Sequence, residues 1–247
     1  LTESLFREGV PVVLTSATLA IRGRMDYFTG RLGAQAADAL VLDTPFDFRT
    51  QVTLYIARHL PNPNDTEQFV PAAADRIRHY IRMTHGSAFV LFTSYAMMRS
   101  LAAELGDFFA EEKLRLFVQG EGLPRSKMLE AFRADISSVI FGTASFWTGV
   151  DVPGDALRNV IIVRLPFSVP DHPLVAARQE DIERRGGRVF ADYALPEAIL
   201  RFRQGFGRLI RSRTDTGIVV VLDRRIVATS YGKGFLESIP ECTVVVE

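Results

Sequence analysis

Short apolar runs alternate with longer amphipathic segments along the chain. This alternation is typical of a parallel sheet whose strands are joined by helices that cover it. The apolar runs predict strands at Val10–Thr15, Leu40–Leu42, Gln51–Ile56, Ser87–Phe92, Leu114–Val118, Ser138–Gly142, Asn159–Val163 and Gly217–Leu222. We therefore expect an α/β fold with a doubly wound parallel sheet.

The amphipathic segments predict the helices. These are Pro71–Thr84, Tyr95–Leu105, Pro124–Arg133, Pro173–Arg185, Pro196–Ser212 and Ser230–Ser238. Several begin with proline, which is tolerated in the first turn because its missing amide hydrogen would have no partner there. A polar connector, His59–Gln68, is rich in turn-forming residues and predicts a flexible loop. Ligands of doubly wound sheets bind beyond the carboxyl ends of the strands, so the loops that follow the predicted strands should carry the chemistry.

Composition narrows the class of protein. The chain has 247 residues, of which 47% are hydrophobic, enough for one large or two small domains with apolar cores. The formal net charge is zero, so any nucleic acid must be bound by a local stripe. One cysteine, Cys242, and four histidines predict neither a disulfide nor a metal site built from this chain. No apolar run has membrane-spanning length and no signal peptide pattern is present, which favours a soluble cytoplasmic protein without a membrane partner.

The segment 204–211, QGFGRLIR, carries one amide and two guanidinium groups. Positions i, i+4 and i+7 share a helix face, so Gln204, Arg208 and Arg211 are expected to project together. Two guanidinium forks beside glycines such as Gly207 suit a polyphosphate that approaches the backbone closely. The alternative is an arginine-rich helix face that only meets solvent.

Hydroxyl side chains follow several of the predicted strands. They are Thr15, Ser16 and Thr18 after the strand that begins at Val10, Thr93 and Ser94 after the strand that begins at Ser87, and Thr143 and Ser145 after the strand that begins at Ser138. Each group alone is also explained as a helix cap, since Ser and Thr are favoured at that position. Three such groups at the ends of different strands, followed in order by the arginine-bearing segment, form a specific pattern.

The loop after the strand that ends at Gly142 combines small residues, aromatic residues and an acid. Gly149 and Asp151 are of the kind that binds the ribose and phosphates of a nucleotide at a strand end. Phe146 and Trp147 would either stack on a base or pack in the core, and packing is the more common role of such residues. Asp151 is equally explained as a turn residue.

These segments, in this order, resemble the motifs of one helicase family. The resemblance is to the carboxyl-terminal half of superfamily 2 helicases of the DinG-type, XPD-like class: 15–19 is similar to motif III, 92–95 to motif IV, 142–154 to motif V, and 204–211, with its Q-x-x-G-R-x-x-R pattern, to motif VI. Further stretches resemble DinG-type proteins in particular: TPFD at 44–47, QG at 119–120, LPFSVPD at 165–171, DRR at 223–225 and YGK at 231–233. The resemblance implies a RecA-like parallel sheet with helices on both faces.

The resemblance also implies site residues. In motif VI, Arg211 would be the arginine finger, Arg208 a second phosphate contact, and Gln204 would orient the site. The nucleotide-binding residues would be Gly149, Asp151 and Gly207. The DNA-binding residues would be Thr93, Ser94, Thr143, Ser145 and Trp147, while Thr15, Ser16 and Thr18 would couple nucleotide hydrolysis to DNA movement.

Several features of the family are missing from the sequence. It contains neither G-x-x-x-x-G-K-[ST] nor D-E-x-H, the segments that cradle the phosphates and hold Mg²⁺. Thr148 stands where motif V of DinG-type proteins commonly has glutamate, and the family's four-cysteine cluster is absent. We therefore expect residues 1–24 to be a motif III strand left over from a first motor lobe and residues 25–247 to be the second RecA-like lobe. ATP and Mg²⁺ would be held mostly by the first lobe of the same polypeptide, and any iron–sulfur cluster would lie outside this chain.

The implied function is that of the second motor lobe of an ATP-dependent DNA helicase that moves 5′ to 3′ on single-stranded DNA. The isolated fragment is expected to be inactive because half of the ATP site is missing. The alternative is a non-catalytic RecA-like module that binds nucleic acid or a protein partner and uses the arginine face for docking. DNA-stimulated ATP hydrolysis by the intact gene product belongs only to the helicase.

Overall fold

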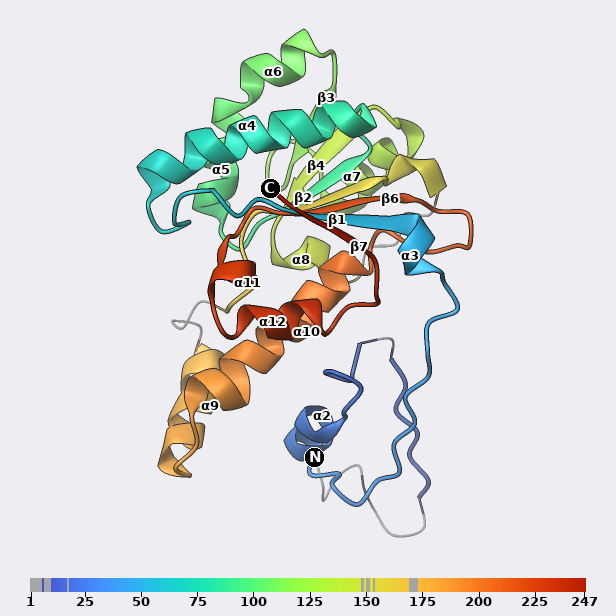
Figure 1. Ribbon diagram of the computed structural model, residues 1–247, viewed down its shortest axis with the longest axis vertical. Helices are drawn as coiled ribbons and strands as arrows, with labels where there is room; N and C mark the ends of the chain where they lie inside the picture. The colour runs from blue at the N-terminus through green and yellow to red at the C-terminus, as the bar shows by residue number, and fades with distance from the viewer. Residues whose placement is uncertain are drawn as a thin grey trace.

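A seven-stranded sheet forms the centre of the protein. The structure is a computed structural model that describes residues 6, 10–16, 18–147, 149, 152, 154–168 and 173–247. The strand order is β3-β4-β2-β5-β6-β1-β7, and every pair of neighbouring strands is parallel (Figure 1). The strands are β1 (Val52–Ile56), β2 (Ala88–Leu91), β3 (Arg115–Val118), β4 (Ser138–Gly142), β5 (Asn159–Ile162), β6 (Gly217–Val221) and β7 (Thr243–Val246). The predicted α/β fold with a parallel sheet is confirmed.

Helices cover both faces of this sheet (Figure 1). One face is covered by α4 (Thr66–Thr84), α5 (Tyr95–Glu104) and α6 (Gly106–Glu111), and the other by α7 (Arg125–Ala134), α8 (Ala144–Trp147), α10 (Leu195–Phe206) and α12 (Gly232–Leu236). Successive strand residues point to opposite faces, so Leu91 packs in the layer of α10 whereas Val90 packs in the layer of α4. The remaining elements are α2 (Asp26–Leu32), α3 (Phe48–Gln51), the 3₁₀ turn η1 (Gly154–Ala156), α9 (Pro173–Arg184), the π-helix η2 (Phe190–Ala194) and α11 (Arg225–Ala228).

The predicted strands from Gln51 onward are confirmed to within one residue at each end. The strand β7 was not predicted, although its Thr-Val-Val-Val sequence is rich in β-branched residues. The strands predicted at Val10–Thr15 and Leu40–Leu42 are wrong, because both segments are irregular in the structure. Val13 is 84% exposed and Leu40 is 80% exposed. An apolar run forms a ladder only beside another strand, and neither segment reaches the sheet.

The helix predicted from Pro71 begins earlier, at Thr66. The carboxylate of Asp65 accepts a hydrogen bond from the backbone amide of Gln68 at 3.3 Å, which caps the helix. Pro71 therefore lies inside α4, and the predicted connector His59–Gln68 is helical at its end. The cap by Asp65 therefore sets the start of the helix, although proline is preferred in the first turn of helices.

Candidate functional site

The candidate site lies along the carboxyl edge of the sheet. Thr93 follows β2 and Thr143 follows β4, and the two strands are neighbours with Leu91 opposite Gly142. Gln119 follows β3, which pairs with β4 on its other side. Parallel strands end at the same edge, so the segments that resemble motifs IV and V are brought together with the loop that follows β3.

Gln119 connects these segments through its side-chain amide. Its Oε1 accepts hydrogen bonds from the backbone amide of Thr143 at 2.7 Å and from the hydroxyl of Thr143 at 3.0 Å. Its Nε2 donates to the hydroxyl oxygens of Tyr95 at 2.8 Å and Ser145 at 3.1 Å. Each of these two hydroxyls accepts from Gln119 and keeps its own hydrogen to donate elsewhere. Gln119 thus orients two hydroxyl donors at the carboxyl edge, a role that sequence reasoning missed.

The other hydroxyls predicted to contact DNA differ in their surroundings. Thr93 is partly exposed. Ser94 caps α5, because its Oγ accepts from the backbone amide of Met97 at 3.2 Å, which agrees with the alternative interpretation as a helix cap. Thr143 is only 4% exposed. The expectation that the Thr143 hydroxyl contacts DNA is wrong for this arrangement, because the hydroxyl is buried and donates to Gln119.

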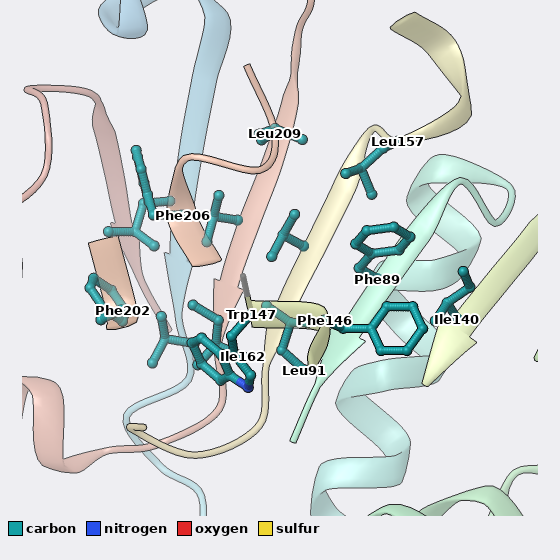
Figure 2. Packing of buried hydrophobic residues seen from close by; sticks show 14 of the residues in the cluster. Phe89, Leu91, Ile140, Phe146, Trp147, Leu157, Ile162, Phe202, Phe206 and Leu209 are labelled. Carbon is teal, nitrogen blue, oxygen red and sulfur yellow. The ribbon is translucent and has the colours of Figure 1, made fainter. Parts of the chain in front are cut away.

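Phe146 and Trp147 are both buried, at 0% and 3% exposed. The Trp147 indole Nε1 donates to the backbone carbonyl of Phe92 at 2.9 Å. Figure 2 shows both rings among the apolar side chains of this face of the sheet, with Phe146 beside Phe89 and Ile140 and Trp147 beside Leu91 and Ile162. The expectation that Trp147 contacts DNA by stacking on a base is therefore wrong, since no face of its ring is open to a ligand.

Glycines make this close packing sterically feasible. A Cβ atom on Gly205 would lie 2.8 Å from the Trp147 ring, and one on Gly142 would lie 2.5 Å from the Phe146 ring. Real Cβ atoms do not approach other atoms so closely, so helix α10 needs glycine where it faces Trp147. Of the two glycines in QGFGR, Gly205 packs against this indole, while the expected nucleotide contact of Gly207 stays a prediction.

Arg125 holds the end of the short helix α8. Its Nη2 donates to the carbonyl oxygens of Ser145 at 2.8 Å and Gly149 at 2.9 Å, and its guanidinium lies 5.5 Å from the centre of the Phe146 ring. Gly149 adopts a left-handed backbone conformation with φ +66°. Arg125 carries no motif signal in the sequence, and it is located only through the fold.

Gln204, Arg208 and Arg211 do not share one face of a helix, contrary to the expectation from their spacing. Helix α10 ends at Phe206, and Gly207 is its C-terminal cap with φ −69° and ψ 1°. Gln204 therefore lies in the last turn of the helix, whereas both arginines lie in the irregular segment that follows. The helix predicted to reach Ser212 stops at Phe206, and the glycine that follows is a poor helix former.

The two arginines have different environments. Arg208 is 8% exposed, and its Nε and Nη2 donate to the carbonyl oxygen of Trp147 at 3.1 and 2.7 Å. Arg211 is exposed, and its backbone amide donates to Oδ2 of Asp215 at 2.7 Å. Motif VI is therefore tied to motif V by the buried Arg208, while the side chain of Arg211 lies at the surface.

Asp215 orders the loop that carries Arg211. Besides the Arg211 amide, its carboxylate accepts hydrogen bonds from the Ser212 backbone amide at 2.8 Å and from the Ser212 hydroxyl at 2.7 Å. Burial alone would raise the pKa of Asp215, but the hydrogen bonds from Ser212 and Arg211 outweigh burial and lower this pKa. The carboxylate thus stays ionised and fixes the backbone on which Arg211 is mounted.

The segment that resembles motif III contacts motif VI. Gln204 Nε2 donates to Thr18 Oγ1 at 3.3 Å, and the Thr18 backbone amide donates to Ser16 Oγ at 3.3 Å. Arg203 Nη1 donates to the carbonyl oxygen of Ala20 at 2.6 Å. Thr15 is exposed. Of the three residues expected to couple the two sites, the structure brings Thr18 to Gln204 directly, with Ser16 next to it.

Two expected features fall on positions that the structure does not describe. Asp151, the predicted nucleotide contact, and Thr148, which replaces the usual glutamate, lie outside the described residues. Within the described ranges, no group of three or more His, Cys, Asp or Glu side chains could hold a metal ion. In the same part of the chain, no helix is both long and apolar enough to cross a membrane.

Comparison with known proteins identifies the family of the chain. Residues 77–242 match the family described as helicase C-terminal domain. The chain is 43% identical over 229 residues to the ATP-dependent DNA helicase YoaA of Haemophilus influenzae, covering 92% of this chain and 35% of that protein. It is 37% identical over 249 residues to the 3′-5′ exonuclease DinG of Bacillus subtilis, covering 99% of this chain and 27% of that protein. The chain thus spans about a third of the length of the first relative and about a quarter of the second.

Solved structures share the fold at low sequence identity. An XPD helicase superposes with a TM-score of 0.60 at 19% identity, covering 78% of this chain and 35% of that one. Dbp5 of S. cerevisiae bound to RNA and ADP BeF3 superposes with a TM-score of 0.53 at 18% identity, covering 89% and 48%. The sheet is therefore RecA-like, as in these helicases, and the predicted resemblance to DinG-type proteins is confirmed. The match to residues 77–242, two thirds of the sequence, shows that this chain belongs to the helicase C-terminal domain family, with DinG and YoaA proteins as its relatives.

Proposed function

We propose that this chain is the carboxyl-terminal motor lobe of an ATP-dependent DNA helicase that translocates on single-stranded DNA, in the 5′ to 3′ direction. One observation carries the proposal: motif VI is bonded on one side to motif V, through Arg208 and the Trp147 carbonyl, and on the other side to the motif III segment, through Gln204 and Thr18. A motor needs such a connection, because movement at the nucleotide must reach the DNA. The YoaA relative of Haemophilus influenzae is named an ATP-dependent DNA helicase, which supports this proposal, whereas the DinG relative of Bacillus subtilis is named a 3′-5′ exonuclease.

Residues 1–24 belong, in this proposal, with a first motor lobe, and residues 25–247 form the second. The apolar side chains of Val10, Val13 and Leu14 are 57%, 84% and 47% exposed. A strand of the first lobe's sheet would cover them and complete the ladder that they lack here. The contacts of Thr18 and Ala20 with α10 would then lie at the junction of the two lobes.

The nucleotide would bind in this junction, with ATP and Mg²⁺ held mainly by the first lobe. ATP supplies the phosphoryl group and Mg²⁺ neutralises charge on it. This chain's contribution is the exposed Arg211, which would stabilise negative charge on the phosphoryl group during transfer. Arg208 is buried, so we assign it the positioning of motif V against motif VI. Contacts of Gly149, Asp151 and Gly207 with the nucleotide, and a direct phosphate contact by Arg208, stay predictions.

Single-stranded DNA would cross the carboxyl edge of the sheet. Thr93 is partly exposed there, and the hydroxyls of Ser145 and Tyr95 accept from Gln119 and keep their own hydrogens for phosphate oxygens. The relevant contacts are thus to the DNA backbone, which suits a motor that moves along any sequence.

The test uses the full-length protein and measures ATP hydrolysis with and without single-stranded DNA. We expect DNA to stimulate hydrolysis, and Arg211→Ala to reduce turnover by roughly 10³–10⁵, the range for arginine fingers, with DNA affinity unchanged. Arg211→Lys should restore little, because a point charge does not reproduce the planar guanidinium.

Arg213→Ala, at an exposed arginine two positions away, is the matched control. Absence of DNA-stimulated hydrolysis would favour a non-catalytic binding module, and equal mild effects of the Arg211 and Arg213 variants would exclude Arg211 as the finger.

A further inference from the structure

Arg164 is a half-buried cation at the carboxyl end of β5. Burial lowers the pKa of its guanidinium and the positive charge of Arg225 lowers it further, while the charge of the Asp223 carboxylate acts in the opposite direction. Its Nη2 donates to the amide oxygen of Asn64, which is neutral. A guanidinium that is partly removed from water normally gains a carboxylate or phosphate partner, because burying an unpaired charge is unfavourable.

The nearby carboxylate is already occupied. Asp223 is 0% exposed, and Arg225 donates to it through Nε at 2.9 Å and through Nη2 at 2.5 Å. The backbone amide of Leu165 donates to the same carboxylate at 2.9 Å. The hydrogen bond with Asp223 raises the pKa of Arg225, as expected for a matched ion pair. Within the described part of the chain, Arg164 makes no ion pair at hydrogen-bonding distance, so the cluster of Arg164, Arg225 and Asp223 keeps one net positive charge.

The position of Arg164 places this charge beside the candidate DNA path. Strand β5 pairs directly with β2, with Ile162 opposite Leu91. Thr93 lies two residues beyond Leu91, and Arg164 lies two residues beyond Ile162, so the two residues follow neighbouring strands at the same distance from the last ladder pair. Neighbouring strands lie about 4.8 Å apart. Thr93 and Arg164 thus follow neighbouring strands at the carboxyl edge, and the Arg164 side chain bonds to Asn64 on the side of β6 and β1.

We propose that Arg164 binds a backbone phosphate of single-stranded DNA that runs along this edge from Ser145 past Thr93. This inference rests on the proposed function and extends its DNA path across one more strand of the sheet. The guanidinium fork suits a phosphate, which would supply the missing anion. Asn64 holds the fork in place by accepting from Nη2 without neutralising it.

The test is the salt dependence of binding by the full-length protein to a single-stranded oligodeoxynucleotide. Each phosphate contact with a single strand contributes about 0.7 to the slope of log K against log salt concentration. We expect Arg164→Ala to reduce that slope by about 0.7 and Arg164→Lys to retain it. The matched control is Arg158→Ala, at an exposed arginine just before the amino end of the same strand, and it should leave the slope unchanged.

A structural role gives a different result. If Arg164 only holds the loop around Asn64, then Arg164→Ala and Asn64→Ala would lower the unfolding temperature similarly and neither would change the salt slope, which would overturn the inference. A rise in the KM for ATP with an unchanged slope would also overturn it, since the bound phosphate would then belong to the nucleotide.

If the wild-type protein binds no single-stranded DNA, both this inference and the proposed function fail. If it binds and only the Arg164 variant lacks an effect, this inference alone fails.

Discussion

Gln204 Nε2 donates a hydrogen bond to Thr18 Oγ1 at 3.3 Å, although the two residues are 186 positions apart. The adjacent Arg203 donates to the Ala20 carbonyl oxygen at 2.6 Å, and burial lowers the pKa of this guanidinium. The last turn of α10 is thus anchored to the amino-terminal segment by neighbouring side chains. In a two-lobe motor this contact would transmit the state of the nucleotide site to the segment shared with the first lobe.

Breaking this contact should uncouple DNA binding from hydrolysis. Thr18→Val keeps the volume of the side chain but removes the acceptor, so we expect DNA stimulation of ATP turnover in the full-length protein to fall several-fold, since a hydrogen bond is worth about 1 kcal/mol. Single-strand affinity should change little. Gln204→Ala should have the same effect, and the double variant should be no worse than either single one. Additive losses would show that the two residues act separately.

Gly205 should be intolerant of even a methyl group. Gly205→Ala would place a Cβ atom 2.8 Å from the Trp147 ring, and overpacking of this kind costs about 1–3 kcal/mol. The free energy of unfolding of the chain, measured by urea denaturation, should fall by that amount. Gly106→Ala is the matched control, because Gly106 is also helical but a Cβ atom there would meet nothing within 4 Å. The control should be neutral or slightly stabilising. Equal effects of the two substitutions would contradict the packing explanation.

The sheet was predictable because its strands are short apolar runs bounded by turn residues. β4 was predicted at Ser138–Gly142 as the structure has it, since its buried run ends at a glycine. The pattern failed at Val10–Thr15 and Leu40–Leu42 because apolarity alone does not supply a neighbouring strand. It also failed beyond Phe206, where the spacing of Gln204 and the arginines continues a helical pattern that Gly207 interrupts.

The candidate site was only partly predictable for a related reason. Motif order identified the segments, and the parallel topology explains why they meet at one edge. The orientation of individual side chains depends on tertiary contacts that spacing does not encode. Trp147 faces the core because Gly205 leaves room for its indole, and Gln119 reaches Thr143 because β3 pairs with β4. Both contacts join residues more than 20 positions apart in the sequence.

The loop of Arg211 should be sensitive to acid through Asp215. The pKa of Asp215 is lowered from 3.8, so its hydrogen bonds stabilise the fold fully above that pH and are lost as pH falls through the lower, folded-state value. We expect Asp215→Asn to reduce the free energy of unfolding by about 1–3 kcal/mol at pH 7, because an amide nitrogen would replace one acceptor oxygen. The difference in the free energy of unfolding between the variant and wild type should shrink below pH 3.8.

Asp38→Asn, at an exposed aspartate, should show no such difference at pH 7 or below pH 3.8. A pH-independent loss for Asp215→Asn would show that ionisation is not involved.

Gln119 should act on DNA binding through the hydroxyls that it orients. Gln119→Ala removes the acceptor for Thr143 and the donor for Ser145 and Tyr95, so we expect single-strand affinity of the full-length protein to fall about tenfold while the KM for ATP is unchanged.

Gln119→Glu separates the acceptor role of this side chain toward Thr143 from its donor role toward Ser145 and Tyr95. The carboxylate still accepts from Thr143 but donates to neither hydroxyl, and its negative charge would lie beside the DNA backbone. We expect a fold as stable as wild type with weaker DNA binding than Gln119→Ala, and the deficit relative to Gln119→Ala should diminish at high salt, where charge repulsion is screened. Tyr95→Phe removes one of the two oriented hydroxyls and should lower affinity by less than Gln119→Ala. If Gln119→Glu binds DNA as tightly as wild type, then Gln119 only fixes Thr143, and the oriented hydroxyls of Ser145 and Tyr95 have no part in holding the strand.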